Sequence, residues 1–583
     1  VELVKGSLNT FLNAMTYPDK TCYPIASCND RDFQNLMHVY MDAVFYPNIY
    51  KKEEIFRQEG WSYHLEKQEG PLTYNGVVYN EMKGAFSSPD DVLERDIMNS
   101  LFPDITYGCE SGGDPDNIPE LSYEEFLEFH RTYYHPSNSY IYLYGNMDME
   151  EKLAFLDEHY LSHFDYLDVD SVIQEQKAFG ACRDVTLEYP VAENEGEEDN
   201  TYLSYNMVVG NAADSQMAMA FEVLDYALLS APGAPLKQAL LDVKAGKDVY
   251  GSYDDGILQP YFTVIAKGSN PDRKEEFVSV IRQVLGDIVK NGIDRKAVEA
   301  GINYFEFRYR EADFSSYPKG LMYSLDILGD WLYEKGNPFA QVQQLTVFEN
   351  LKKAVNEGYF EELIRKYLLE NPHGCIMTLI PKKGLAAQRE KELEEKLEAY
   401  RSSLSEEQLD AMVEKTKALE AYQEAGEDPK ALECIPMLKR SDIKREAAKI
   451  INEELTVDDS LFLYHDVCTN GIGYVDLMFK TDSIAPEQIP YLGLLKSVLG
   501  YVDTENYTYG ELFNEINANT GGINCGVEVF DRADSTEEFQ AMFSVRGKAL
   551  YTKMDFLFKM IGEILNSSKL EDTKRLYEIV ASV

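Results

Sequence analysis

A unit in which a strand, a helix, a pair of strands and a second helix follow one another recurs along this chain of 583 residues. The two clearest copies comprise residues 201–209, 214–229, 250–253, 261–267 and 272–289, and residues 473–480, 486–499, 524–530, 539–545 and 553–565. The last helix of each copy is amphipathic, as Phe277, Ile281 and Leu285 illustrate. Such a recurrence predicts lobes in which helices cover a sheet.

The first 145 residues contain a third and less regular copy. Residues 7–16 are predicted as a strand and residues 21–27 as its hairpin partner across a turn. Asn29 or Asp30 caps the next helix, which carries apolar residues at helical spacing and stops before Pro47. The other elements expected here are helices over residues 53–66, around Glu81, from Ser88 to residue 101 or 102 and over 122–134, and a strand over 140–144.

A different texture separates the later copies. Residues 384–426 are charged and helical, and Ser405 with Gln408 forms a capping box that starts the second of two expected antiparallel helices. We therefore expect an α+β protein of repeated α/β sandwich lobes, each an antiparallel sheet covered by helices, with a helical hairpin linker between two halves. The expected divisions are a first lobe over residues 1–165, a second lobe over 180–383, the linker over 384–451 and a third lobe over 452–583.

Length and charge exclude several classes of protein. A chain of 583 residues exceeds the roughly 250 to 300 residues that one core supports. The net charge of -46 repels a phosphate backbone, which argues against nucleic acid and favours cationic or neutral ligands, unless the acidic surface serves only solubility. No apolar run approaches the roughly 18 residues of a membrane span. The eight cysteines lack C-x-x-C spacing, which indicates reduced thiols.

Glu81 is the candidate functional carboxylate. It lies in Gly76-Val77-Val78-Tyr79-Asn80-Glu81-Met82-Lys83-Gly84, a largely apolar stretch in which Val77, Val78 and Met82 can pack inward. Spacing alone does not single Glu81 out, because an isolated glutamate on a helix is usually a solvated surface residue.

The segments around Glu81 change this interpretation. They are Leu12-Asn13-Ala14-Met15-Thr16, Asp32-Phe33-Gln34-Asn35-Leu36, Gln58-Glu59-Gly60-Trp61, Ser111-Gly112-Gly113-Asp114-Pro115 and Tyr134-His135-Pro136-Ser137-Asn138. In this order they resemble the presequence protease branch of the insulinase-like, pitrilysin-type zinc peptidases. That family uses an inverted H-x-x-E-H motif with a distal glutamate as third zinc ligand, and its distal glutamate matches Glu81.

The chain departs from the family in one important respect. None of its eight histidines lies in an H-x-x-E-H motif, which in the family precedes the segment that corresponds to Val1. His159 and His163 have the i,i+4 spacing of a metal pair, but Ser162 stands where a general base is needed, so a structural pair near a helix end is the favoured interpretation. We therefore expect the interior of a longer peptidase, with the first lobe incomplete at its start, the third at its end, and no catalytic residue within the chain.

The resemblance implies a function for the longer protein. This protein is expected to be a zinc metalloendopeptidase that degrades short unfolded peptides, with Glu81 as metal ligand and Leu12, Asn13 and Ala14 as the strand that pairs with substrate. The chain alone is expected to bind zinc poorly and to be inactive. Residues 111–115 are expected to form a surface turn rather than an anion-binding nest.

Two other classes remain open, a zinc-free structural or peptide-holding relative and an acidic module that binds basic peptides. The expected compartment is the bacterial cytoplasm, or an organellar matrix in a eukaryote. The chain is expected as a monomer or in association with the piece that precedes it.

Overall fold

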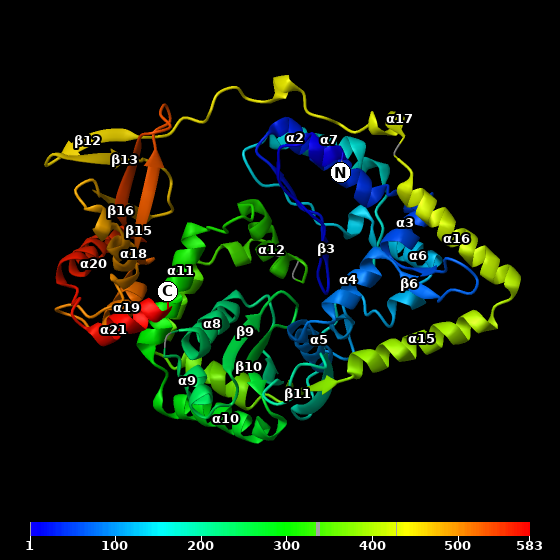
Figure 1. The fold of residues 1–583 in the computed structure, drawn as a ribbon, viewed down its shortest axis with the longest axis horizontal. Coiled ribbons are helices and arrows are strands. Elements are labelled where there is room, and N and C mark those ends of the chain that lie inside the picture. Colours follow the sequence, from blue (N-terminus) through cyan, green and yellow to red (C-terminus); the bar gives the residue numbers. More distant parts are fainter. Residues whose placement is uncertain (1, 232, 334–337, 427, 583) are drawn as a thin grey trace.

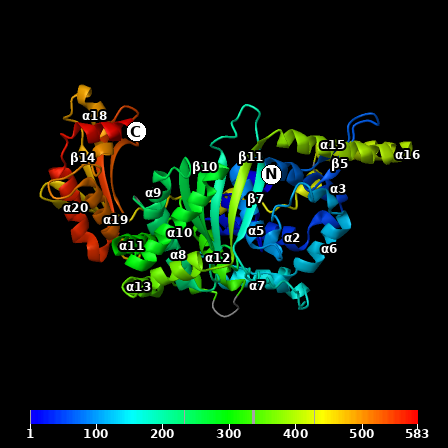
Figure 2. The same ribbon diagram turned by 90° about the horizontal axis from the view of Figure 1, so that it is seen from below.

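The computed structural model describes residues 2–231, 233–333, 338–426 and 428–582, so the predicted boundaries at Val1 and Val583, and the turn residue Glu427, lie outside it. Figure 1 shows the second lobe flanked by the first lobe and the third lobe, with an extended part of the linker crossing between these two. Figure 2 shows the first and third lobes on opposite sides of the second. The mixture of sheets and helices confirms the predicted α+β class.

A five-stranded sheet with the order β7-β11-β8-β10-β9 forms the centre of the second lobe. Its strands are β7 Arg183–Val191, β8 Thr201–Val208, β9 Asp248–Asp254, β10 Tyr261–Ser269 and β11 Gly374–Lys383. β9 and β10 confirm the predicted strand pair. The expectation of an antiparallel sheet is wrong at one pair, since β11 runs antiparallel to β8 but parallel to β7. The chain reaches β11 after a long helical crossover, which lets this strand enter between β7 and β8.

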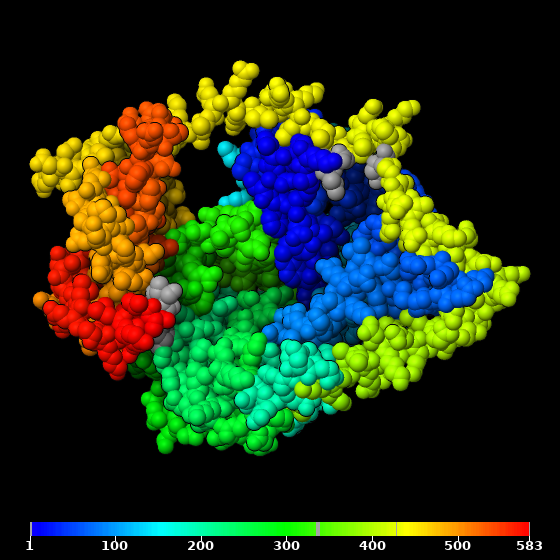
Figure 3. Space-filling model, in the orientation of Figure 1, coloured from blue at the N-terminus to red at the C-terminus, as the bar shows by residue number. Residues whose placement is uncertain are grey.

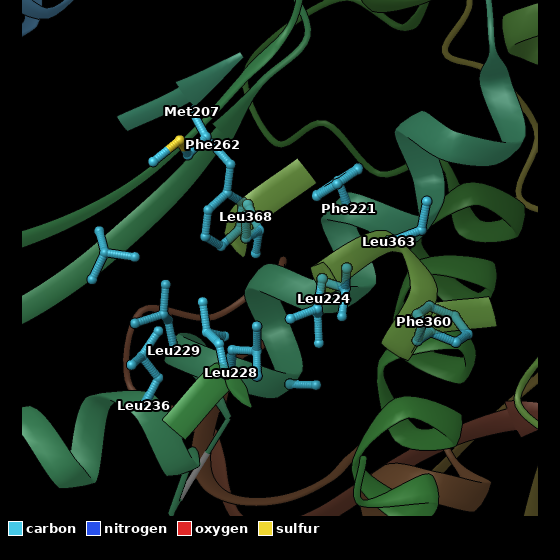
Figure 4. Packing of buried hydrophobic residues seen from close by; sticks show 14 of the residues in the cluster. Met207, Phe221, Leu224, Leu228, Leu229, Leu236, Phe262, Phe360, Leu363 and Leu368 are labelled. Carbon is cyan, nitrogen blue, oxygen red and sulfur yellow. The ribbon is translucent and has the colours of Figure 1, made fainter. Parts of the chain in front are cut away.

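Helices cover one face of this sheet from within the second lobe. They are α8 Ser215–Asp225, α9 Pro235–Asp242, α10 Lys274–Asn291, α11 Arg295–Glu311, α12 Lys319–Trp331, α13 Leu345–Ala354 and α14 Tyr359–Leu363. Figure 4 shows Phe262 of β10 and Phe221 of α8 among the side chains that fill this core. Phe277, Ile281 and Leu285 of α10 are buried in it, as their spacing predicts.

A helix of the first lobe covers the other face. Leu93, Ile97 and Leu101 of α5, residues Pro89–Leu101, pack against Tyr202 and Tyr261 of the sheet. All three leucine and isoleucine side chains are at most 2% exposed. The first two lobes therefore share a core.

The first lobe contains three two-stranded ladders and, among its described residues, no larger sheet. Its elements are α1 Glu2–Lys5, β1 Asn9–Leu12, β2 Met15–Thr16, β3 Thr21–Cys22, β4 Ile25–Ser27, α2 Asp30–Phe45, α3 Glu53–Glu59, β5 Ser62–His64, β6 Thr73–Asn75, α4 Val77–Ala85, α5, α6 Tyr123–Tyr133 and α7 Met149–His159. β1 pairs with β4 and β2 with β3, so residues 9–27 form one irregular hairpin. The predicted hairpin is confirmed, but its first strand is interrupted at Asn13 and Ala14.

Side-chain caps start the helices of the first lobe where the sequence predicts them. The Asn29 side chain accepts hydrogen bonds from the amides of Arg31 and Asp32, and Ser88 accepts one from the amide of Asp91. These caps confirm the predicted starts of α2 and α5.

Two predicted elements of the first lobe are wrong. The helix expected over residues 53–66 ends at Gly60, and residues 62–64 belong to β5. The strand expected over residues 140–144 has no strand partner among the described residues. Side-chain packing against α12 holds this segment instead, with the ring of Tyr140 4.6 Å from that of Trp331 and the ring of Tyr144 5.7 Å from that of Tyr323.

The linker consists of two long helices and an extended segment. The helices are α15 Leu385–Ser403 and α16 Glu406–Glu424, followed by the short α17 Pro429–Leu432. Ser405 and Gln408 form the predicted capping box. The two helices diverge from their connection, and the β5–β6 hairpin lies between them in Figure 1. Leu65 and Leu72 of this hairpin region pack with Leu397 and Val413 of the linker.

The third lobe has its own three-stranded sheet with the order β14-β16-β15. Its elements are β12 Glu453–Val457, β13 Ser460–Tyr464, β14 Ile472–Lys480, α18 Ile489–Val498, α19 Tyr509–Asn519, β15 Ile523–Asp531, β16 Phe539–Leu550, α20 Met554–Ser567 and α21 Thr573–Ser582. Met560 and Ile564 of α20 are buried against this sheet, as predicted. β12, β13 and α19 were not predicted from the sequence, and every residue of β12 and β13 is exposed.

Candidate functional site

A cavity of about 2800 Å³ lies between the first and second lobes. Its walls include the 9–27 hairpin, α2, the extended segment 137–147 and α12, and among its lining residues are Phe11, Tyr134 and Trp331. Figure 3 shows the deep recess and the open space around it, with the linker passing across. Ligand sites for small molecules measure roughly 300 to 1,000 Å³, so this cavity has room for a peptide segment.

Glu81 lies on the solvent-exposed side of α4. Tyr79, which is 4% exposed, is the residue that anchors this helix, whereas Val77 and Val78 are 51% and 38% exposed. Gly76, with φ 153°, starts the helix close to the backbone, because a Cβ there would meet the carbonyl oxygen of Gly60 at 2.2 Å. The inward packing allowed for Val77 and Val78 is therefore wrong, and Tyr79 fills that place.

The turn at residues 111–115 packs against the same helix. A Cβ on Gly112 would meet the sulfur of Met82 at 2.5 Å, so glycine lets the turn approach the residue next to Glu81. The amides of Gly112 and Gly113 donate to Glu110, and the amide of Asp116 donates to Asp114. These amides serve the turn itself, which supports the surface-turn interpretation over an anion nest.

Leu12, Asn13 and Ala14 lie at the joint between the β1–β4 and β2–β3 ladders. Asn13 and Ala14 are exposed, and the amide of Ala14 donates to the Asn13 side chain at 2.9 Å. The amide of Asn13 donates to the carbonyl oxygen of Pro24 at 3.3 Å. Thr10 and Phe11, the residues just before this joint, line the cavity, whereas Leu12–Ala14 and Glu81 border it without appearing among its described lining residues.

The described residues alone do not fit a zinc site. A catalytic zinc takes three protein ligands. No three histidine, cysteine, aspartate or glutamate side chains come together closely enough to hold a metal within the described ranges. Glu81 supplies one carboxylate there. The eight cysteines are all free.

The candidate histidine pair is structural. α7 ends at His159, and the backbone of Tyr160, with φ -133° and ψ -67°, leaves the helix, so His163 does not continue the same helical face. The His159 ring packs on Phe155 at 4.4 Å and beside His38 at 6.4 Å. This agrees with the favoured interpretation of a pair at a helix end.

Recessed acidic side chains of the second lobe form a feature that the sequence analysis did not identify. Burial raises the pKa of Glu222 to about 8, helped by the charges of Asp255 and Asp225 and opposed by Arg308. Burial likewise raises the pKa of Asp255 to about 6 and that of Asp326 to about 6. These groups come from α8, the β9–β10 connection and α12. Only the adjacent acids at 254–255, directly after a predicted strand, offered a signal in the sequence.

No helix in the described ranges is long and apolar enough to cross a membrane. This agrees with the absence of a long apolar run in the sequence.

Two families match the chain. The family described as "Peptidase M16 inactive domain" matches residues 120–305, and a second family, described as associated with subgroup C of the M16 peptidases, matches residues 379–583. The sequence is 47% identical over 580 residues to "Protein HypA" of Clostridium perfringens, covering 100% of this chain and 60% of that protein.

Plant and animal relatives match over the same length. The chain is 36% identical to "Presequence protease 1, chloroplastic/mitochondrial" of Arabidopsis thaliana, covering 100% of this chain and 54% of that protein. It is 30% identical to "Presequence protease, mitochondrial" of Xenopus laevis, covering 99% of this chain and 56% of that protein. The chain thus spans little more than half the length of the curated relatives it matches.

Proposed function

This chain belongs to the presequence protease branch of the M16 peptidase family, and from this premise we propose that it forms part of a zinc metalloendopeptidase that degrades short unfolded peptides. The observation that carries the proposal is the alignment of the whole chain with presequence proteases at 36% and 30% identity. The M16 peptidases are generally zinc-dependent. In this proposal Glu81 is the one metal ligand that the chain contributes, and Leu12, Asn13 and Ala14 bind substrate.

The cavity supports a peptide substrate. It is bounded by two lobes and measures about 2800 Å³, which suits an extended segment better than a folded domain. An extended peptide that pairs with the exposed joint at Asn13 and Ala14 is recognised through its backbone, so sequence selectivity is expected to be broad. The net charge of -46 favours basic peptides and disfavours nucleic acid.

The proposed setting of this protein follows from its relatives. They include a bacterial protein and presequence proteases whose names place them in mitochondria or chloroplasts. We place this protein in the bacterial cytoplasm or, in a eukaryote, in an organellar matrix. It acts there as a monomer, or together with a separate piece that carries the H-x-x-E-H motif.

A zinc-free, peptide-holding relative is the second candidate. One of the two matching families is itself described as an inactive domain, and the described residues alone do not fit a zinc site. Under this alternative the cavity still binds peptides, without cleavage.

Peptide cleavage distinguishes the two candidates. A protein of the relatives' length that contains this chain is assayed with a quenched basic peptide, as wild type, as Glu81→Gln and as Glu124→Gln. Glu124 is an exposed helix glutamate of the same lobe and serves as the matched control. We expect Glu81→Gln to lose at least about a hundredfold in kcat/KM and Glu124→Gln to retain activity, because only the first removes a ligand carboxylate.

Two results contradict the proposal. Wild-type protein that binds the peptide without cleaving it supports the peptide-holding alternative. Full activity in Glu81→Gln removes Glu81 from the site. The 583-residue chain alone, loaded with zinc and assayed in the same way, is expected to show no turnover.

A further inference from the structure

The turn that connects β2 and β3 ends in a buried ion pair. The amide of Tyr17 donates to the carbonyl oxygen of Lys20 at 2.8 Å, which closes the turn. Between them the Asp19 side chain is 0% exposed and that of Lys20 is 9% exposed, with their charged groups 3.0 Å apart. A carboxylate is rarely buried to this degree without several hydrogen-bond donors.

Those donors come from distant parts of the chain. The Tyr107 hydroxyl donates to Asp19 Oδ2 at 2.7 Å, and the Tyr333 hydroxyl donates to the same oxygen. Burial and the Asp19 charge raise the pKa of both tyrosines above their ordinary value, which keeps them protonated as donors. Lys20 Nζ serves the other carboxylate oxygen, so both oxygens of Asp19 are occupied.

The same network ties the turn to the second lobe. Lys20 Nζ also donates to the carbonyl oxygen of Gly256 at 3.0 Å, and the amide of Leu258 donates to the Tyr107 hydroxyl at 2.9 Å. Gly256 and Leu258 lie in the β9–β10 connection, and Tyr333 follows α12. Asp19 therefore joins the tip of the 9–27 hairpin to the best-packed part of the molecule.

The position of the tip bears on the rest of the hairpin. β2 and β3 lead directly into β1 and β4, with Leu12, Asn13 and Ala14 at the joint. These ladders are short, and a two-stranded hairpin is only marginally stable by itself. Asp19, Lys20 and Tyr333 line the same cavity as Thr10 and Phe11.

We propose that Asp19 is a positioning residue that holds the hairpin, through Tyr107, Tyr333 and Lys20, in the place where its Leu12–Ala14 joint receives an extended peptide. This rests on the proposed function, since it assigns a role in the same substrate site. Asp19 does not touch the peptide. It fixes where the pairing strand stands relative to the second lobe, so that the ordering of the strand is completed before substrate binds.

Hydrogen exchange of this chain tests the anchor without reference to activity. Tyr333→Phe removes one donor to Asp19 and keeps the ring, and Asp19→Asn removes the charge. Tyr166→Phe is the control, because Tyr166 lines the same cavity with an 82% exposed side chain. We expect amides 9–27 to exchange about tenfold faster in Tyr333→Phe, faster still in Asp19→Asn, and as in wild type in Tyr166→Phe, with α10 unchanged in all three. Unchanged exchange of residues 9–27 in both test variants overturns the anchor.

Kinetics of a protein of the relatives' length that contains this chain test the positioning role. Tyr333→Phe is expected to raise KM about fivefold to tenfold for a peptide substrate while kcat stays within about twofold, since strand order affects binding. A purely structural role predicts faster exchange with KM unchanged, and that result overturns the proposal. A wild-type protein that cleaves no peptide overturns the proposed function and with it the positioning role, whereas the exchange result still decides whether Asp19 holds the hairpin.

Discussion

The second lobe and the first lobe of this molecule are stabilised in different ways. The second lobe encloses a five-stranded sheet, and its central strand β8 is buried at every residue. The first lobe has only two-stranded ladders among its described residues, and it depends on neighbours for support. Its α5 packs on the sheet of the second lobe, and its β5–β6 hairpin packs between the linker helices.

This difference separates stability from the proposed chemistry. The residues assigned to substrate and metal, Asn13, Ala14 and Glu81, are exposed and lie on the elements with borrowed support. The second lobe supplies the rigid side of the cavity. We infer that the positions of the candidate site residues depend on contacts between lobes, and the following variants test this contrast.

The largest effect is expected in the core of the second lobe. Phe221→Ala removes a ring that is 0% exposed and is expected to lower the free energy of unfolding by about 3 to 5 kcal/mol. Phe129→Ala in the first lobe, where the ring is 58% exposed, is expected to change it by about 0.5 kcal/mol or less. Urea denaturation followed by circular dichroism measures both. Equal losses in the two variants contradict the contrast.

The next effect concerns the support that the linker gives to the first lobe. Leu397→Ala on α15 removes a side chain that is 4% exposed, and is expected to cost about 2 to 3 kcal/mol locally. Hydrogen exchange is expected to quicken in residues 62–75 and to stay unchanged in β8. Leu461→Ala, at a site that is 68% exposed, is the matched control. Quickening of β8 as strongly as of residues 62–75 shows that the two regions unfold together.

A third effect depends on pH. Glu222 has a pKa raised from 4.5 to about 8, so between these values the folded protein holds a proton that the unfolded chain releases. Its contribution therefore lowers the free energy of unfolding as pH rises through this window. Glu222→Gln is expected to be more stable than wild type by about 1 to 3 kcal/mol at pH 8 and little different at pH 4.5.

Thermal denaturation at several pH values measures this dependence, with Glu124→Gln as the exposed control. A stabilisation that is the same at pH 4.5 and pH 8 means that Glu222 does not titrate in this window.

The smallest effect is expected where the second and third lobes meet. Glu311 at the end of α11 accepts hydrogen bonds from Lys548 Nζ at 2.7 Å and from the Tyr474 hydroxyl at 2.9 Å, both on the third-lobe sheet. Glu311→Gln is expected to weaken this contact by about 1 kcal/mol. Small-angle scattering is expected to show a slightly larger radius of gyration, with the second-lobe core unaffected. An unchanged radius at both low and high salt shows that other contacts hold the third lobe.

Local interactions made much of this fold predictable from the sequence. The caps at Asn29, Ser88 and Ser405 act within three residues, so they identify helix starts without knowledge of the fold. The stripe of Phe277, Ile281 and Leu285 likewise shows which face of α10 is buried. These are the parts of the prediction that the structure confirms.

Partners far along the chain decided the parts that were missed. The segment 140–144 has the composition of a strand, but its neighbours are the aromatic rings of α12 rather than a second strand. Gly60 ended a helix whose pattern of apolar residues continues beyond it. Asp19 looked like an ordinary turn residue, because its two tyrosine donors lie 88 and 314 residues away in the sequence.

The candidate site was identified only through the family resemblance, and the structure shows why. Glu81 is an exposed helix residue, and within the described ranges no histidine or cysteine cluster marks it as a ligand. Residue patterns within this chain therefore do not distinguish Glu81 from any other surface glutamate.

Zinc content tests the central claim most directly, that Glu81 is the metal ligand this chain brings to a peptidase. A protein of the relatives' length that contains this chain is loaded with zinc, dialysed and analysed by atomic spectrometry as wild type, Glu81→Gln and Glu124→Gln. We expect about one zinc per molecule in the wild type and in Glu124→Gln, and less than about a tenth of that in Glu81→Gln, because the neutral amide replaces a ligand carboxylate. Equal zinc in all three proteins, or none in the wild type, contradicts the claim.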